Sequence, residues 1–188
     1  LVKLEVLGAE HLLRSQPCVY LANHQSAWDF ATFAAIYPAK TILIGKRELK
    51  FIPVLGQLFM LFGNILVNRK TQGGALVGMQ DAVDALTVRR DSIFMFPEGT
   101  RNHTGAGLLP FKHGAFYMAV TAQVPLVPIV CAPLAPRLSM SKRYVRPGRL
   151  ALRVLPAIQT RGKTLDDLKA LARETRDRML LAFNELAQ

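Results

Sequence analysis

The sequence predicts an α/β fold in which a mixed, largely parallel sheet is flanked by helices in a single-domain sandwich over residues 1–188. Three observations predict it. Short apolar runs alternate with helical patterns, no Ser-, Gly- or Pro-rich linker divides the chain, and 188 residues with 51% hydrophobic content suffice for one core but are short for two. Short buried strands separated by helices are typical of such a sandwich.

Seven short apolar runs are the candidate strands. The second follows Pro17, and the fifth ends at Pro97, which cannot donate to a strand ladder. In chain order the candidate strands are 2–7, 18–22, 41–44, 64–67, 92–96, 126–130 and 150–155.

Helical patterns occupy the segments between these runs. In the last segment Thr164 and Asp167 have the spacing of a capping box, and an apolar stripe runs from Leu165 to Phe183. In chain order the candidate helices are 28–36, 54–61, 73–87, 113–123 and 165–186.

The charge of the chain is strongly positive. With 24 Lys+Arg against 13 Asp+Glu, the net charge is +11 and the pI about 10.2, which favours an anionic partner. Nucleic acid is disfavoured because aromatic content is only 8%, no nucleic-acid-binding motif appears and the basic residues are dispersed. Cys18 and Cys131 lie in apolar runs and are expected to be buried thiols in a reducing compartment.

No apolar stretch is long enough to cross a membrane as a helix. The longest, residues 51–63, is interrupted by Pro53, Gly56 and Gln57 and falls short of the roughly 20 residues that a span needs. The chain starts at Leu1 within a candidate strand, so we expect an upstream membrane-anchoring segment to be missing.

The stretch from Asn23 to Asp29 places a histidine five positions before an aspartate, directly after a buried run. A helix would turn His24 and Asp29 roughly 140° apart, and a strand would hold them roughly 16 Å apart on opposite faces. A bend between strand and helix allows them to meet, and a histidine held by an aspartate is a suitable general base. Alternatively, Ser26 and Asp29 form a capping box and His24 is an ordinary turn residue.

Charged or ionisable groups follow four successive apolar runs: His24, Lys46, Arg69 and the stretch 98–101. Loops that leave strand ends are where ligand sites collect in α/β folds. This coincidence favours a site at one edge of the predicted sheet.

The stretch 96–101 has the composition of a phosphate-binding loop. Gly99 allows close approach of the backbone to a ligand, Thr100 adds a hydroxyl, and Arg101 adds a forked guanidinium suited to phosphate. Glu98 is expected to accept substrate hydroxyls or to position Arg101. A turn with a surface ion pair is the alternative.

Six short motifs occur along roughly residues 5 to 155. They are Asn-His-x4-Asp at 23–29, Lys-Arg-Glu-Leu with Ile-Pro and Gly at 46–56, Gly-to-Arg through an apolar run at 63–69, Phe-Pro-Glu-Gly-Thr-Arg at 96–101, Phe-Lys-His-Gly-Ala-Phe at 111–116 and Val-Pro-Leu-Val-Pro at 124–128. Together, and in this order, they resemble the glycerolipid acyltransferase family, which includes bacterial lysophosphatidic acid acyltransferases.

The resemblance implies the glycerol-phosphate acyltransferase fold. It also implies transfer of a fatty acyl chain from acyl-CoA or acyl carrier protein to the free hydroxyl of lysophosphatidic acid, giving phosphatidic acid. His24 would be the general base and Asp29 would fix its tautomer, with no metal and no cofactor besides the acyl donor. The substrate-binding residues that it implies are Arg101, Arg69, Lys46, Glu98, Gly99, Thr100 and Lys112. For Lys46 and Lys112, a solvated rim charge is the alternative.

A lysophospholipid substrate implies an anionic membrane surface as partner. The expected location is the cytoplasmic face of the inner (plasma) membrane, peripheral or anchored through the missing upstream sequence. The apolar run 51–62 is expected at the lipid interface, with an ordinary buried helix as the alternative. The basic cluster Lys142, Arg143, Arg146 and Arg149 is expected to meet anionic headgroups or acyl carrier protein, with a basic loop as the alternative.

Other readings remain open. A non-enzymatic membrane lipid-binding module would not need the base. A metal-dependent hydrolase would use His24, Asp29, His103 and His113, which lack common metal-ligand spacings. Ser26 as an acylated nucleophile is a further alternative. Within the acyltransferases, the acceptor is open between lysophosphatidic acid and another lysolipid, such as a lyso-ornithine lipid, or glycerol 3-phosphate.

Overall fold

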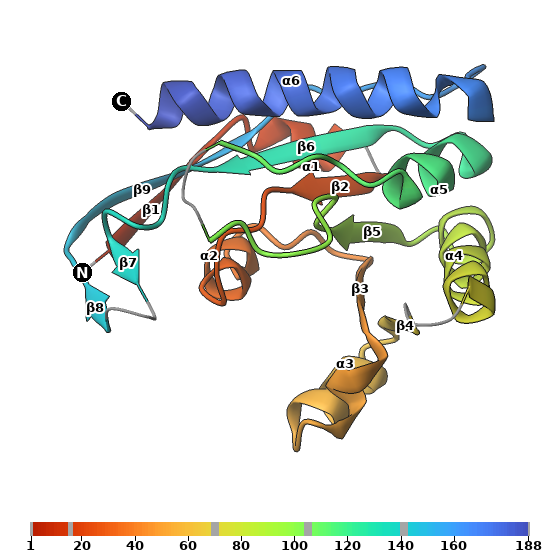
Figure 1. The fold of residues 1–188 in the computed structure, drawn as a ribbon, viewed down its shortest axis with the longest axis horizontal. Helices are drawn as coiled ribbons and strands as arrows, with labels where there is room; N and C mark the ends of the chain where they lie inside the picture. The colour runs from red at the N-terminus through yellow and green to blue at the C-terminus, as the bar shows by residue number, and fades with distance from the viewer. Residues whose placement is uncertain (1, 15–16, 69–71, 104–106, 140–142, 188) are drawn as a thin grey trace.

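A seven-stranded sheet forms the middle layer of the protein, with helices on both of its faces (Figure 1). The structure is a computed structural model that describes residues 2–14, 17–68, 72–103, 107–139 and 143–187. Its main strands are β1 (Val2–Leu7), β2 (Val19–Ala22), β3 (Thr41–Lys46), β4 (Ile65–Val67), β5 (Ser92–Met95), β6 (Leu126–Cys131) and β9 (Gly148–Val154).

The strands lie in the order β1-β9-β6-β2-β5-β3-β4. Every neighbouring pair is parallel except β6 with β9, which is antiparallel. The predicted mixed, largely parallel sheet is thus confirmed. Because β2, β5, β3 and β4 run in the same direction, their carboxyl ends meet at one edge.

The helices and the short hairpin complete the fold. They are α1 (Glu10–Arg14), α2 (Asp29–Ala34), the 3-10 helix η1 (Arg47–Phe51), α3 (Leu55–Leu61), α4 (Gln72–Thr87), α5 (Gly114–Ala122), the 3-10 helix η2 (Leu165–Asp167), α6 (Leu168–Leu186) and the two-stranded β7 (Leu138–Ser139) with β8 (Tyr144–Val145). In Figure 1, α6 lies along one side of β6, whereas α3 projects beyond β3 and β4, away from the other helices.

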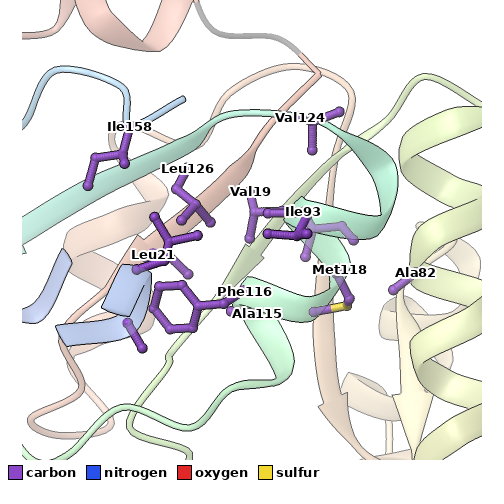
Figure 2. Close-up of a cluster of buried hydrophobic side chains, with 14 of the residues drawn as sticks. Val19, Leu21, Ala82, Ile93, Ala115, Phe116, Met118, Val124, Leu126 and Ile158 are labelled. Carbon is purple, nitrogen blue, oxygen red and sulfur yellow. The ribbon is translucent and has the colours of Figure 1, made fainter. Parts of the chain in front are cut away.

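The core has two parts because side chains alternate between the faces of a strand. In β2, Val19 and Leu21 belong to one buried cluster, which includes residues of α4, α5 and α6. Tyr20 and Ala22 belong to the other, together with Phe33 of α2. Figure 2 shows Phe116 and Met118 of α5 among the buried side chains of the first cluster.

All seven predicted strands are present, and all five predicted helices are found with shifted ends. The first predicted helix, 28–36, is shortened to Asp29–Ala34, and the last begins with the 3-10 turn η2. The capping box of Thr164 and Asp167 is present. Helix α1, η1 and the β7–β8 hairpin were not predicted, since segments this short show no readable periodicity.

Both cysteines are free and buried, as predicted. Burial raises the pKa of the Cys18 thiol to about 12 and also raises that of Cys131, so neither is a thiolate at neutral pH. No helix in the described part of the chain is both long enough and apolar enough to cross a bilayer.

Candidate active site

His24 and Asp29 meet in the turn that joins β2 to α2. Nδ1 of His24 lies 2.6 Å from Oδ2 of Asp29. The same oxygen accepts the backbone N–H groups of Gln25 at 2.7 Å and Ser26 at 3.0 Å. Asp29 is fully buried, whereas 14% of the His24 side chain is exposed. The turn therefore brings the pair together as the spacing predicted, and Asp29 holds the turn and the imidazole with one oxygen.

The capping box of Ser26 and Asp29, the alternative interpretation of this turn, is only half formed. Asp29 accepts from the Ser26 N–H, but Oγ of Ser26 accepts from the Trp28 N–H at 3.0 Å, and α2 begins at Asp29 with no side-chain cap. Asp29 therefore bonds the backbone of the turn and holds His24, but its side chain does not cap α2.

The loop after β5 contacts both the imidazole ring and the backbone of His24. The imidazole stacks on the Phe96 ring with a centroid distance of 4.0 Å and an interplanar angle of 13°. The His24 N–H donates to Oε1 of Glu98 at 2.8 Å, and its carbonyl accepts the Asn102 N–H at 2.7 Å. Ring and backbone of His24 are therefore fixed by one neighbouring loop.

Glu98 is buried, and its carboxylate holds two separate backbone segments. Oε1 accepts from His24, and Oε2 accepts the Leu109 N–H at 2.9 Å. Burial raises the pKa of Glu98, and the two backbone donors act in the opposite direction. Glu98 therefore links the segment at His24 to the segment at Leu109. Its contact with a glycerol-phosphate stays a prediction.

Two amides hold the other side of the turn. Asn23 donates through Nδ2 to the Cys131 carbonyl at 3.0 Å and accepts the Cys131 N–H at 2.8 Å. Gln25 donates to the carbonyls of Cys131 and Ala132 and accepts the Leu134 N–H at 3.0 Å. The end of β6 thereby fixes the residues on both sides of His24. The role of Gln25 was not predicted, because a glutamine in a turn gives no sequence signal for bonds to a distant strand.

A cavity of about 320 Å³ opens beside His24 at the carboxyl edge of the parallel strands. Its polar wall includes Lys46 from the end of β3 and the loop residues Gly99, Thr100 and Arg101. Its apolar wall includes Phe59 of α3. The structure thus brings together five of the residues predicted for the site. Arg69, also predicted, lies outside the described residues.

Lys112 lies behind Gly99 and not in the wall of this cavity. Gly99 has a φ of +70°, which favours glycine, and a Cβ added there would lie 2.9 Å from Cδ and Cε of Lys112, whose flexible side chain would have to move. Lys112 lines a neighbouring cavity of about 230 Å³, whose other walls include Met79, Met95 and Met118. A cavity with polar and apolar walls and a mainly apolar cavity thus both border Gly99.

The cations at the site are free to meet an anion. Within the described residues, no carboxylate forms an ion pair with Lys46, Arg101 or Lys112. Lys46 and Arg101 are exposed and contribute positive charge to the cavity that His24 lines. Over the same described part of the chain, no three His, Cys, Asp or Glu side chains are grouped as a metal site would require.

A residue of the C-terminal helix also supports this region. Arg176 of α6 donates through Nε to the Leu109 carbonyl at 3.1 Å and through Nη2 to the Leu108 carbonyl at 2.6 Å. It therefore fixes the segment whose Leu109 N–H binds Glu98. The role of Arg176 was not predicted, because its sequence position does not distinguish it from the other arginines of this helix.

The predicted basic cluster lies around the β7–β8 hairpin. Arg146 stacks over Tyr144 at 4.5 Å, and Arg149 approaches Glu5 at 3.7 Å. Arg143 is exposed, and Lys142 lies outside the described residues. Contact of this cluster with headgroups or a carrier protein stays a prediction.

The chain is similar to a known protein family and to several of its members. A family model described as Acyltransferase matches residues 3–132. The chain is 41% identical over 187 residues to the 1-acyl-sn-glycerol-3-phosphate acyltransferase alpha of Mus musculus, covering 99% of the chain but 65% of that protein. It is 36% identical over 168 residues to the 1-acyl-sn-glycerol-3-phosphate acyltransferase of Escherichia coli strain K12, covering 89% of the chain and 67% of that protein.

A solved structure shares the fold. It is that of the 1-acyl-sn-glycerophosphate (LPA) acyltransferase PlsC from Thermotoga maritima, with a TM-score of 0.80 and 22% identity over 98% of this chain and 72% of that one. At this identity the likeness concerns the fold alone. The chain spans slightly less than two thirds of the length of the mouse relative.

Proposed function

Because the chain belongs to the acyltransferase family, whose model covers residues 3–132, we propose that it transfers a fatty acyl chain from an acyl thioester to 1-acyl-sn-glycerol 3-phosphate, giving phosphatidic acid. The observation that carries the proposal is that His24, bonded to the buried Asp29, lines a cavity that Arg101 and Lys46 also line. A base for the acceptor hydroxyl and cations for its phosphate thus share one pocket.

In the proposed reaction the acceptor hydroxyl attacks the thioester directly. With Nδ1 of His24 protonated and donating to Asp29, Nε2 takes the hydroxyl proton as the oxygen bonds to the carbonyl carbon. The tetrahedral intermediate then collapses, the carbon–sulfur bond breaks, and the imidazolium returns the proton to the leaving thiolate. Asp29 stabilises the imidazolium between these steps. No acyl-enzyme and no cofactor enter the reaction.

The arrangement of the cavity supports a phosphorylated acceptor. Arg101 offers a fork of donors to phosphate oxygens, and Lys46 adds a second positive charge. Acyl-CoA or acyl carrier protein would bring the acyl chain as co-substrate. Since these donors are cytoplasmic and the acceptor is a membrane lipid, we place the reaction at the cytoplasmic face of the inner (plasma) membrane.

The test is acyl transfer by the purified protein with an acceptor panel. The panel holds lysophosphatidic acid, the matched 1-acylglycerol without phosphate, glycerol 3-phosphate and a lyso-ornithine lipid, each with acyl-CoA and with acyl carrier protein as donor. We expect turnover with lysophosphatidic acid to exceed that with the phosphate-free acceptor. A preference for the lyso-ornithine lipid or for glycerol 3-phosphate would overturn the proposed acceptor.

His24→Ala tests the mechanism in the same assay. We expect turnover to fall by about 10²–10⁴, because the general base is lost. A folded His24→Ala protein with near-parental turnover would refute the role of the histidine. Absence of turnover with every acceptor in the parent protein would instead support a lipid-binding module.

A further inference from the structure

The segment that follows β3 exposes a concentration of large apolar side chains. Among the described residues, seven of the fifteen exposed large hydrophobic side chains lie within residues 51–62. We call them the apolar ridge; they are Phe51, Ile52, Val54, Leu58, Met60, Leu61 and Phe62. An isolated exposed leucine is ordinary, but a contiguous apolar patch marks a binding surface.

The ridge is built into the fold and is not a poorly packed end. Phe59 faces inward, is 7% exposed, and packs so closely on β3 that a Cβ added to Gly45 would lie 2.8 Å from its ring. On the outer side of α3, Leu58 and Leu61 have the i, i+3 spacing of one helix face, and the exposed Val54 directly precedes the helix. Leu61 is 78% exposed and Phe51 is 74% exposed. The fold therefore holds one face of α3 against the protein and directs the other away from it. In Figure 1 the helix lies beyond β3 and β4, away from the other helices.

Positive charge borders the ridge on its N-terminal side. Lys46, Arg47 and Lys50 precede it, with Glu48 as the only acidic residue between Lys46 and Phe62. Nζ of Lys50 lies 4.8 Å above the Phe51 ring. Apolar side chains beside lysine and arginine match the boundary between acyl chains and anionic headgroups. Protein interfaces, in contrast, are depleted in lysine, so the charge pattern favours a lipid surface.

The ridge is continuous with the candidate active site. Lys46, Leu49 and Phe59 line the cavity that also contains His24. With seven residues, α3 is too short to span a bilayer, so an apolar face of this size is suited to lie in the interface. A lipid surface that binds the apolar ridge would therefore also lie next to the His24 cavity.

We propose that the apolar ridge, with Lys46, Arg47 and Lys50, docks the protein on an anionic lipid bilayer and places the opening of the His24 cavity at the lipid surface. The acceptor then reaches the cavity while its own acyl chain stays in the membrane. The consequence for acceptor access depends on the proposed function, whereas docking itself does not.

Vesicle flotation of the purified protein tests the docking. The vesicles are neutral phosphatidylcholine alone or with 30% phosphatidylglycerol added. We expect Leu58→Ser combined with Leu61→Ser to lower the partition coefficient on anionic vesicles by roughly 10-fold or more, since two leucine side chains lose burial in lipid. The matched control is Val88→Ser combined with Leu165→Ser, which removes two exposed apolar side chains elsewhere and should leave binding unchanged.

Two further readouts complete the test. With a short-chain, monomerically dissolved lysophosphatidic acid, the ridge variant should keep parental turnover, whereas turnover with vesicle-embedded acceptor should fall together with binding. Equal flotation of parent and ridge variant overturns the proposal, and equal binding to neutral and anionic vesicles overturns the part played by the three cations.

A parent protein that dimerises without lipid, and a ridge variant that does not, would show that a second copy covers the ridge. Absence of turnover in all forms would overturn the proposed function and leave the flotation result intact.

Discussion

Replacing Asp29 by Asn separates the structural role of this side chain from its charge. The asparagine oxygen can take the place of Oδ2 and keep the bonds from Gln25, Ser26 and His24. Its amide nitrogen then occupies the place of Oδ1, which is buried and has no hydrogen-bond partner among the described residues. The variant therefore gains an unpaired buried donor, which should cost about 1–3 kcal/mol of unfolding free energy.

The effect on catalysis follows from the loss of charge beside the imidazolium. A hydrogen bond to a charged group contributes about 1.5–3 kcal/mol, and each 1.36 kcal/mol is tenfold in rate. In the proposed mechanism the hydrogen bond from His24 to the Asp29 carboxylate is stronger when the imidazole is protonated. Loss of the Asp29 charge should therefore lower kcat roughly 10- to 150-fold in Asp29→Asn. The KM for lysophosphatidic acid should change little, because Asp29 is fully buried and does not reach the substrate.

Thiol release from the acyl donor measures kcat, and urea unfolding measures stability. The matched control is Ser26→Ala, which removes only the bond from the Trp28 N–H to Oγ and leaves the charge of Asp29. We expect this control to lose about 0.5–1.5 kcal/mol of unfolding free energy and to keep kcat. If Asp29→Asn loses stability but keeps parental kcat, Asp29 serves only the turn and the reasoning is refuted. A loss of kcat in Ser26→Ala would revive Ser26 as a nucleophile.

Two other predictions concern the support of the site. Because the pKa of Glu98 is raised, its contribution to stability is complete below the pKa of the unfolded carboxyl and is lost as pH rises through the folded pKa. Glu98→Gln has no carboxyl to titrate and therefore lacks this dependence of stability on pH. In urea unfolding, the free energy of unfolding of the parent minus that of the variant should shrink as pH rises from 4.5 to 7.5. A difference that stays constant over this range would contradict the raised pKa of Glu98. Arg176→Met should speed hydrogen exchange of the Leu109 amide, because the Leu109 carbonyl loses its donor. Arg178→Met, whose guanidinium pairs with Glu174 on the surface, is its control, and equal exchange in both variants would show that Arg176 does not fix the loop.

The sheet and the placement of His24, Lys46 and Arg101 were predictable because both leave local signals. Buried strands are continuous apolar runs, and a parallel sheet gathers the residues that follow those runs at one edge. His24, Lys46 and Arg101 therefore line one cavity, as their positions after three such runs predicted. The bend that joins His24 to Asp29 was predictable because no regular element allows that spacing.

The supporting contacts were not predictable because they join residues far apart in sequence. That both oxygens of Glu98 bind backbone N–H groups depends on the positions of His24 and Leu109, which only the fold provides. The bonds of Gln25 to the end of β6 have the same origin. The exposure of Leu61 depends on how closely Phe59 packs on Gly45, and composition alone does not specify that contact.

The two amides beside His24 also set the time at which a growing chain acquires this site. Asn23 bonds to Cys131, 108 residues later, and the His24 N–H bonds to Glu98, 74 residues later. Contacts at such separations form late, because the intervening chain must be ordered first. A chain emerging from the ribosome therefore carries the histidine and the aspartate before it has the partners that hold their turn, because residues 131–134 are made later. In that interval His24 is present without its fixed geometry, and the site matures only when β6 joins β2.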